Sequence, residues 1–505
     1  VFNKMNKKKV SVLVLISVAI YLGWTLLLLT KDPVVFPDET SFASIAWSLI
    51  DKARFSTTAY SSQLPQIQLE DFVYHGPIYY ILLAGVFKVF GFGLISTRVS
   101  SVILGLFVIG LAYWLSRLLK ISLKWAWLPG ILLAVDYNFL RIARFGRPEV
   151  LVMLLAGLSL GWYIKLNQSP SRKNYIILGG LLVLGVLTHL ALGWLVVVAI
   201  GVDVLVTKNW KVLKLNKIIW PALLAVIGLG GWFWYSKVLI KDLNQVSLAV
   251  ETRFLPSFRS IQAILAGDLV IKIIFGLYGL VLMMLMLVRN KNRGEKLWSI
   301  VSLIMVIGVF WGGVDWYLGL LSMMVYVGLG LLINRFIKKN DSWYNLVLLL
   351  SCVVFFLNLL EQLRIDRFYY QYDYAGYSQE IAKHLRSGAK VWMKPLIPDP
   401  MFYLMENRPD LKLAYEEYFD HNQARMKRYL EQADYVIVYG FDYQAMELTK
   451  EVDEKKAETL MKQVNMNKIL EEKLKSNQNE VILIEGNEYY SSLAIYDFNH
   501  SILKP

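Results

Sequence analysis

Two adjacent carboxylates, Asp38 and Glu39, are the residues of this chain best placed to do chemistry. They follow the first long hydrophobic stretch, and the segment after them carries apolar residues at the spacing of an amphipathic helix: Phe42, Ile45, Ala46 and Leu49. A carboxylate held at a bilayer surface can serve as a general base on a lipid-borne substrate. A solvated loop followed by an ordinary juxtamembrane helix is the alternative explanation.

The stretch RIARFGRPEV combines arginines with another carboxylate. Arg141, Arg144 and Arg147 recur every three residues, so a helix would align them in a ridge that ends at Glu149. Planar guanidinium groups suit phosphate oxygens, although binding of lipid headgroups by a basic interfacial turn would explain the same pattern. Asp136 costs about 2.5–3.5 kcal/mol in lipid, so we expect it to face the interior or to pair with one of these arginines.

Two histidines and a tyrosine are further candidates for substrate binding. His75 precedes a Gly-Pro turn, Tyr79 follows it, and His189 lies in a Thr-His turn between two hydrophobic stretches. Aromatic belts at the membrane surface explain such tyrosines without any chemistry, and a lone histidine in a turn is more often structural.

The segment 241–265 mixes basic and apolar residues and could lie over a donor site. Its Arg253 and Arg259 are candidates for binding phosphate, whereas an ordinary surface loop is the alternative. A divalent metal ion stays an open option, because hard ligands are available at Asp38, Glu39, Glu149 and His189 without a diagnostic spacing.

Composition excludes a soluble enzyme. The 505 residues are 56% hydrophobic with a mean hydropathy of +0.45, and apolar stretches of membrane-spanning length recur to about residue 361. The single cysteine, Cys352, excludes an intrachain disulfide and a cysteine-based metal site. The net charge of +14 gathers in short connectors between apolar stretches, which indicates cytoplasmic loops rather than binding of nucleic acid.

These basic connectors, with the N-terminus, predict a topology with the N-terminus in the cytoplasm. About eleven spans follow, at 10–30, 98–119, 125–141, 149–166, 174–189, 191–207, 218–240, 268–289, 297–312, 315–333 and 343–361. The apolar piece 77–92 is short and carries Lys88, so we interpret it as an interfacial or re-entrant helix; counting it as a span is the alternative. The candidate residues then collect on the outer face.

Residues 362–505 lose the long apolar runs and predict a small extracytoplasmic α/β domain after a transmembrane domain at 1–361, whose first outer loop is 31–97. Strand-like segments occur at 389–396, 434–440, 480–486 and 493–498, and helical stretches near 377–387, 414–432 and 443–476. With no phosphate loop or nucleophile elbow, this domain is expected to cap the site or to grip an acceptor.

The acidic pair after the first helix, the stretch YHGPIYYILLAGVFKVFG with Arg98 beyond it, and RIARFGRPE occur in this order. Together they resemble the polyprenyl-phosphate-dependent glycosyltransferases of the GT-C fold. Those include glycosyltransferase family 39, the protein O-mannosyltransferases and the lipid A aminoarabinose transferases. The resemblance covers residues 10–200 and is architectural from there to 361.

The resemblance implies that Asp38 is the general base, with Glu39 as its neighbour. It implies that Arg144 and Arg147 serve the donor phosphate, and that Glu149 stands where many members carry Asp. The chain departs from the family at Gly76, where His-Pro-Pro is usual, and at Leu190, where proline usually follows Thr-His.

The activity that the resemblance implies is transfer of a sugar from a polyprenyl-phosphate donor to an acceptor hydroxyl at the outer face, with inversion at the anomeric carbon. The partners are the lipid-linked donor, a glycolipid, glycan or protein acceptor, and membrane lipids. A lipid or glycolipid transporter or flippase is the alternative from another class, although no inverted repeat is apparent. An oligosaccharyltransferase is disfavoured, because the tail lacks a Trp-Trp-Asp tripeptide.

Overall fold

The chain folds into two compact units in a computed structural model. The bundle unit comprises residues 1–33, 72–86 and 95–368, and the tail unit comprises residues 34–71, 87–94 and 369–505. The structure describes residues 7–30, 35, 37–55, 75–210, 215–239, 269–287, 292–312, 315–336, 349, 351–361, 374–394, 401–415, 433–439, 480–484 and 493–497.

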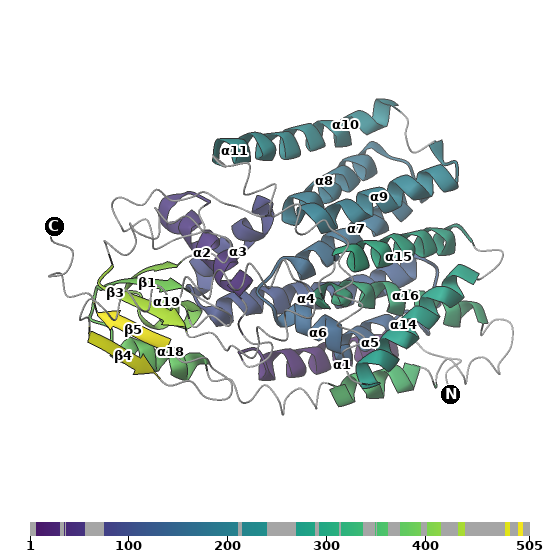
Figure 1. Ribbon diagram of the computed structural model, residues 1–505. Helices are drawn as coiled ribbons and strands as arrows, with labels where there is room; N and C mark the ends of the chain where they lie inside the picture. The colour runs from purple at the N-terminus through teal and green to yellow at the C-terminus, as the bar shows by residue number, and fades with distance from the viewer. Residues whose placement is uncertain are drawn as a thin grey trace, which may run out of the picture. The chain divides into compact units, whose positions relative to one another are not determined.

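Hydrophobic stretches form the helices of the bundle unit (Figure 1). These are α1 (Lys7–Leu27), α3 (Pro77–Phe90), α4 (Leu94–Leu118), α5 (Leu128–Val135), α6 (Tyr137–Arg144), α7 (Glu149–Gln168), α8 (Arg172–Thr188), α9 (Leu190–Val206), α10 (Leu215–Ala225), α11 (Gly231–Leu239), α14 (Leu269–Leu287), α15 (Arg293–Gly312) and α16 (Gly319–Phe336). The last four residues of α3 and the first of α4 belong to the tail unit. Neighbours in the bundle include α7 with α8, α8 with α9, and α9 with α15.

Three helical stretches are long and apolar enough to cross a membrane, judged by length and composition: Leu94–Leu118, Glu149–Gln168 and Ile218–Ser236. Other apolar helices, α3 among them, are shorter. The chain is therefore a helical membrane protein. The total of about eleven spans, the orientation and the interfacial placement of 77–92 stay predictions.

The segment 125–141 is not the single span that hydropathy predicts. It contains α5 and the start of α6, which are eight residues each and separated by Asp136 in an extended conformation. An eight-residue helix is about 12 Å long, well short of the ~30 Å hydrocarbon core. The break arises because the Asp136 carboxylate accepts a hydrogen bond from the Phe139 amide and so begins a new helix.

Close helix packing depends on small residues at the crossings. A Cβ atom on Gly179 of α8 would lie 2.5 Å from the Cβ of Pro221 in α10, so only glycine allows this approach. Arg172, at the start of α8, places its guanidinium 4.0 Å from the ring centroid of Trp220. Glycine and a cation–π contact therefore hold α8 against α10.

Among the described residues, the stretch formed by α10, the π-helix Val226–Gly230 and α11 has several strongly exposed apolar side chains. Val226, Ile227 and Trp234 are 70%, 71% and 72% exposed. Large apolar side chains on a continuous helical surface fit a lipid-facing span.

The described strands of the tail unit form one five-stranded mixed sheet. They are β1 (Lys390–Lys394), β2 (Lys412–Tyr415), β3 (Tyr435–Tyr439), β4 (Glu480–Ile484) and β5 (Leu493–Asp497), in the order β2-β1-β3-β5-β4. β1 pairs in parallel with β2 and β3, whereas β5 runs antiparallel to β3 and β4. Four strands occupy segments with predicted strand character. β2 overlaps the start of the predicted helix 414–432, of which the rest lies outside the described residues.

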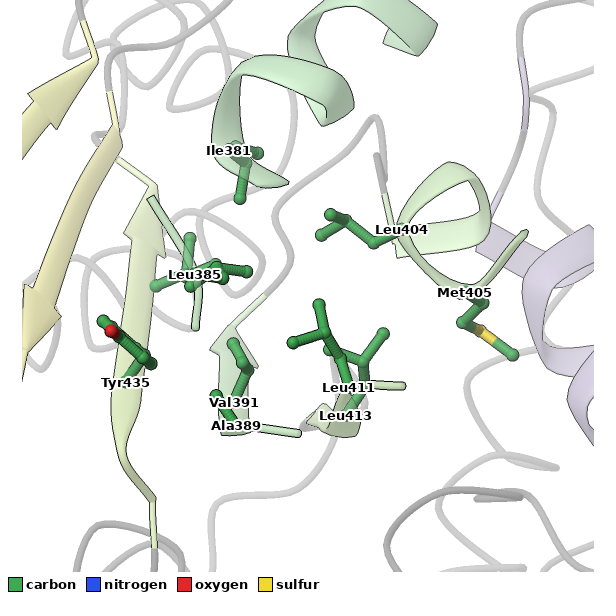
Figure 2. Packing of buried hydrophobic residues seen from close by; sticks show 10 residues of the cluster. Ile381, Leu385, Ala389, Val391, Leu404, Met405, Leu411, Leu413 and Tyr435 are labelled. Atoms are coloured by element: carbon green, nitrogen blue, oxygen red, sulfur yellow. The ribbon is translucent and has the colours of Figure 1, made fainter. Parts of the chain in front are cut away.

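The core of the tail unit lies between the sheet and two short helices, α18 (Tyr374–Lys383) and α19 (Met401–Asn407). Figure 2 shows side chains from both helices and from three strands directed into this cluster. Its members are Ile381, Leu385, Ala389, Val391, Leu404, Met405, Leu411, Leu413, Tyr435 and Ile437.

One helix of the first loop belongs to this tail unit. The helix α2 (Pro37–Lys52) and the segment 87–94, which contains the turn between α3 and α4, group with the tail, whereas the sequence places both in the transmembrane domain. The compact units therefore divide the chain differently from a single boundary after residue 361.

Candidate functional site

Asp38 and Glu39 lie in the first turn of α2, which begins at Pro37. Proline fits the first helical position, and carboxylates are stabilised there by the partial positive charge of the helix N-terminus. Asp38 is half-buried and Glu39 is fully buried. Asp38 is therefore the more accessible of the two carboxylates.

The amphipathic prediction for α2 is only half right. Phe42, Ile45 and Ala46 are buried as expected, but Leu49 is half-exposed. The polar residues Thr40, Ser44 and Ser48, at a spacing of four, are buried as well. The helix is therefore covered on its polar side too, rather than lying with that side in water.

The arginine ridge predicted over 141–149 does not form, because α6 ends at Arg144 and Phe145 is extended. Arg147 lies in the connection to α7, where its Nε and Nη2 atoms are 3.0 and 2.8 Å from Oε1 of Glu149. Both side chains are buried. The predicted neighbourhood of arginine and carboxylate exists, but as a pair across a turn.

Two buried arginines from different helices point to the C-terminal end of α1. Arg98 of α4 donates from Nη1 to the Leu29 carbonyl oxygen at 2.8 Å, and Arg144 donates from Nη1 to that of Trp24 at 3.4 Å. Trp24 lies in the last turn of α1, where carbonyl groups carry partial negative charge, and Leu29 lies in the turn that follows this helix. This explains how the bundle unit accommodates two guanidinium groups that are 0% exposed.

His75 and His189, far apart in the sequence, lie together in the bundle unit. Their ring centroids are 4.3 Å apart, and both rings are buried. His189 is the N-cap residue of α9, where its Nδ1 accepts a hydrogen bond from the Leu192 amide, and its Nε2 lies 3.1 Å from the hydroxyl of Tyr317. Because Nδ1 is the acceptor, Nε2 carries the hydrogen and donates it to Tyr317.

The departure from His-Pro-Pro at Gly76 has a steric reason. A Cβ atom there would clash with the backbone carbonyl of Leu187, near the end of α8. Glycine therefore lets the His75 turn approach the Thr188–His189 turn. The different motif reflects the packing of two turns and is compatible with a retained role for His75.

The buried carboxylate of Asp136 has four hydrogen-bond donors, of which the sequence gives no indication. It accepts hydrogen bonds from the hydroxyls of Tyr278, Ser322 (2.7 Å) and Tyr326 (2.6 Å), besides the Phe139 amide at 2.7 Å. Asn358 joins this cluster through Tyr326 and the Tyr137 amide. The first of the two expectations for Asp136 is correct, since it faces the bundle interior.

This cluster anchors α6 to α14, α16 and the helical segment Ser351–Glu361. Four donors compensate the desolvation of one carboxylate, which makes the cluster rigid and costly to disturb. Because α6 ends at Arg144, the cluster fixes one end of the helix that carries this guanidinium. The only sign of this cluster in the sequence is a polar residue, Asp136, inside an apolar stretch.

The remaining candidates have different outcomes. Tyr79 is fully buried, so it packs inside and is not part of an exposed aromatic belt. Arg253 and Arg259 lie outside the described residues.

The candidate residues are divided between the two units. Asp38 and Glu39 belong to the tail unit, whereas Arg147, Glu149 and the histidine pair belong to the bundle unit. Among the described residues, no three His, Cys, Asp or Glu side chains gather closely enough to hold a metal ion.

The helical bundle with its α/β tail has the GT-C fold, as the sequence resemblance predicts. The structure of ArnT from Cupriavidus metallidurans bound to undecaprenyl phosphate matches 99% of this chain and 100% of its own, with a TM-score of 0.65 and 13% identity. The Archaeoglobus fulgidus oligosaccharyltransferase in complex with Zn and sulfate matches 85% of this chain and 68% of its own, with a TM-score of 0.54 and 12% identity.

Sequence comparisons are less informative. No family model matches the chain. An uncharacterized protein of Aquifex aeolicus (strain VF5) is 25% identical over 213 residues, which are 42% of this chain and 41% of that protein's own length.

Proposed function

We propose that this protein is a membrane glycosyltransferase that moves a sugar from a polyprenyl-phosphate donor to an acceptor hydroxyl at the outer membrane face. The observation that carries the proposal is the match of nearly the whole chain to the fold of ArnT bound to undecaprenyl phosphate. The match covers 99% of this chain and therefore includes both the bundle unit and the tail unit.

In the proposed reaction, the acceptor oxygen attacks the anomeric carbon of the sugar. The bond from that carbon to the phosphate oxygen breaks, and the lipid phosphate leaves with the bonding electrons. Asp38 accepts the proton of the acceptor hydroxyl, which is the role of a general base. One displacement without an enzyme nucleophile inverts the anomeric configuration.

The arginines of the bundle unit are suited to the departing phosphate. Arg144 and Arg147 come from neighbouring turns, and guanidinium donors stabilise charge that grows on phosphate oxygens. Glu149 neutralises part of this charge and holds Arg147 in one orientation. Arg253 and Arg259 are proposed to assist from the 241–265 loop.

Substrate-binding roles are proposed for His75, Tyr79, Glu149 and His189. The contact between the two histidine rings supports a joint role for this pair. Glu39 supports Asp38 as its neighbour in the first turn of α2.

The test is transfer by the purified full chain in vesicles with labelled polyprenyl-phosphate sugars and extracted glycolipids, glycans or proteins as acceptors. Asp38→Asn should lower turnover by about 10²–10⁴-fold, the contribution of a general base, while thermal unfolding stays unchanged. The matched control is Asp51→Asn, near the other end of α2, which should keep wild-type activity. Near-normal transfer by Asp38→Asn would refute the assignment, and lipid flux without transfer would indicate a transporter.

A further inference from the structure

The helix that carries Asp38 belongs to the tail unit, although more than 300 residues separate it from the tail's core. Three separate segments make up this unit: 34–71 with α2, 87–94 with the turn between α3 and α4, and 369–505 with the sheet. Figure 1 also draws α2 in purple beside the sheet. The predicted base therefore shares a compact body with the soluble sheet.

Two aromatic side chains make this connection. Trp47 of α2 and Phe92 of the turn both pack on the tail's core cluster, which includes Leu404 and Met405 of α19. Their rings meet edge to face with centroids 5.5 Å apart, and Phe87 lies 5.2 Å from Phe92. Edge-to-face pairs contribute about 0.5–1.5 kcal/mol beyond the burial of their area. We call the contact of Trp47 and Phe92 with the cluster the aromatic joint.

A polar contact lies beside the aromatic joint. Glu406 of α19 accepts a hydrogen bond from the amide of Leu94 at 3.5 Å, and its Oε1 lies 2.8 Å from where a Cβ of Gly93 would be. Leu94 is the first residue of α4, whose amide has no partner within the helix. A carboxylate is favoured at such a helix N-terminus. Two kinds of contact, the aromatic packing and the hydrogen bond to Glu406, therefore hold the turn that carries Phe92 on the tail's core.

Because Trp47 and Asp38 lie on the same helix, the aromatic joint at Trp47 also fixes the position of Asp38. Trp47 follows Asp38 by nine residues, about 13 Å along a helix that behaves as a rigid rod. A small tilt at Trp47 therefore displaces the carboxylate at the other end. A displacement of 1 Å at a reacting group can cost about 100-fold in rate.

We propose that Trp47 and Phe92 are positioning residues, through which the tail unit holds α2 and thereby sets the place of Asp38. This inference rests on the proposed function, because it takes Asp38 as the base. The tail then has a structural role in positioning Asp38, besides any contact with an acceptor.

The test uses the full-length protein in nanodiscs and four variants: Trp47→Ala, Phe92→Ala, the conservative Trp47→Phe, and the matched control Phe90→Ala, which removes a phenyl that is 68% exposed two residues before Phe92. Two quantities are measured for each: amide hydrogen exchange of residues 37–52 and the kinetics of sugar transfer. Both alanine variants should speed exchange in α2 by about 10-fold and lower kcat by about 10–100-fold, with KM for the donor within about twofold. Trp47→Phe should retain most of the activity, and Phe90→Ala should behave as wild type.

Amide hydrogen exchange in β1 and β3 shows whether the sheet stays folded in each variant. If the sheet of Phe92→Ala is unfolded, Phe92→Leu is used in its place. Unchanged exchange in α2, or faster exchange with an unchanged kcat, would overturn the inference. If wild-type protein transfers no sugar, the proposed function fails. In that case, unchanged α2 exchange would refute the aromatic joint as well, whereas faster exchange would retain it as a structural connection without a catalytic role.

Discussion

The guanidinium Nη2 of Arg147 lies 2.8 Å from Oε1 of Glu149, and both side chains are buried in the bundle unit. A buried pair of this kind compensates two desolvation penalties at once, so removing one partner is far more costly than removing both. The pair lies between the end of α6 and the first residue of α7, and therefore fixes the turn between these helices.

Glu149→Gln should lower the midpoint of thermal unfolding in detergent, because it removes the charge beside the Arg147 guanidinium. Loss of one partner of a buried pair costs about 3–5 kcal/mol. The double variant Arg147→Gln/Glu149→Gln should recover most of that stability without recovering binding of the polyprenyl-phosphate donor. A double variant as unstable as Glu149→Gln would contradict the ion-pair explanation.

The two nitrogens of His189 can be tested separately. His189→Asn keeps an acceptor for the Leu192 amide but cannot reach Tyr317, whereas His189→Ala loses both contacts. Asparagine is a good residue at a helix N-cap, so thermal unfolding of the Asn variant should be close to wild type, with Ala lower by about 1 kcal/mol. If the Nε2 side serves the substrate, both variants should bind the donor more weakly. If His189→Asn binds the donor as well as wild type does, His189 serves only as the N-cap of α9.

Gly76→Pro would restore the His-Pro-Pro motif of the resembling family, yet it should destabilise this protein. Its ring would clash with the Leu187 carbonyl, and so would the methyl of Gly76→Ala. Backbone atoms cannot move aside as flexible side chains do, and overpacking of this kind costs about 1–3 kcal/mol or more. Gly85→Ala in α3 is the matched control, because a Cβ there meets nothing within 4 Å. Equal unfolding midpoints for Gly76→Ala and Gly85→Ala would contradict this explanation.

Acid should weaken the tail unit through Asp410. Hydrogen bonds from the Arg408 guanidinium hold the pKa of the Asp410 carboxyl well below its usual range. A carboxyl whose pKa is lower in the folded state adds stability above its unfolded pKa, about 3.9, and this stability is lost as pH falls through the folded value. The group is exposed, so the effect is small. Exchange in β1 and β2, measured from pH 5 to pH 3 and corrected for the intrinsic rate, should therefore rise more in wild type than in Asp410→Asn. The same rise in both would exclude Asp410 as its source.

Local signals in the sequence were sufficient for most elements. Apolar runs predicted α4, α7 and α8 to within about four residues at each end, and alternating or β-branched runs predicted four of the five strands. The GT-C fold followed from the order of three motifs. The sequence also predicted the neighbourhood of Arg147 and Glu149, since only Pro148 lies between them. Each of these features depends on residues close together in the chain.

Hydropathy alone could not reveal the break at Asp136. Its three hydroxyl donors come from α14 and α16, so the cluster exists only after these helices pack around the carboxylate. In the same way, 113 positions lie between His75 and His189, whose contact requires a glycine at 76 to let two turns approach.

For the carboxylates of α2, the sequence by itself determined their place in a first helical turn after the first span. Only the tertiary structure decided that this helix packs with a sheet whose first strand begins at Lys390. The physical reason is that helical periodicity and hydropathy are properties of neighbouring residues. The burial of Trp47 and Phe92 on a common core, by contrast, arises from side chains that folding alone brings together.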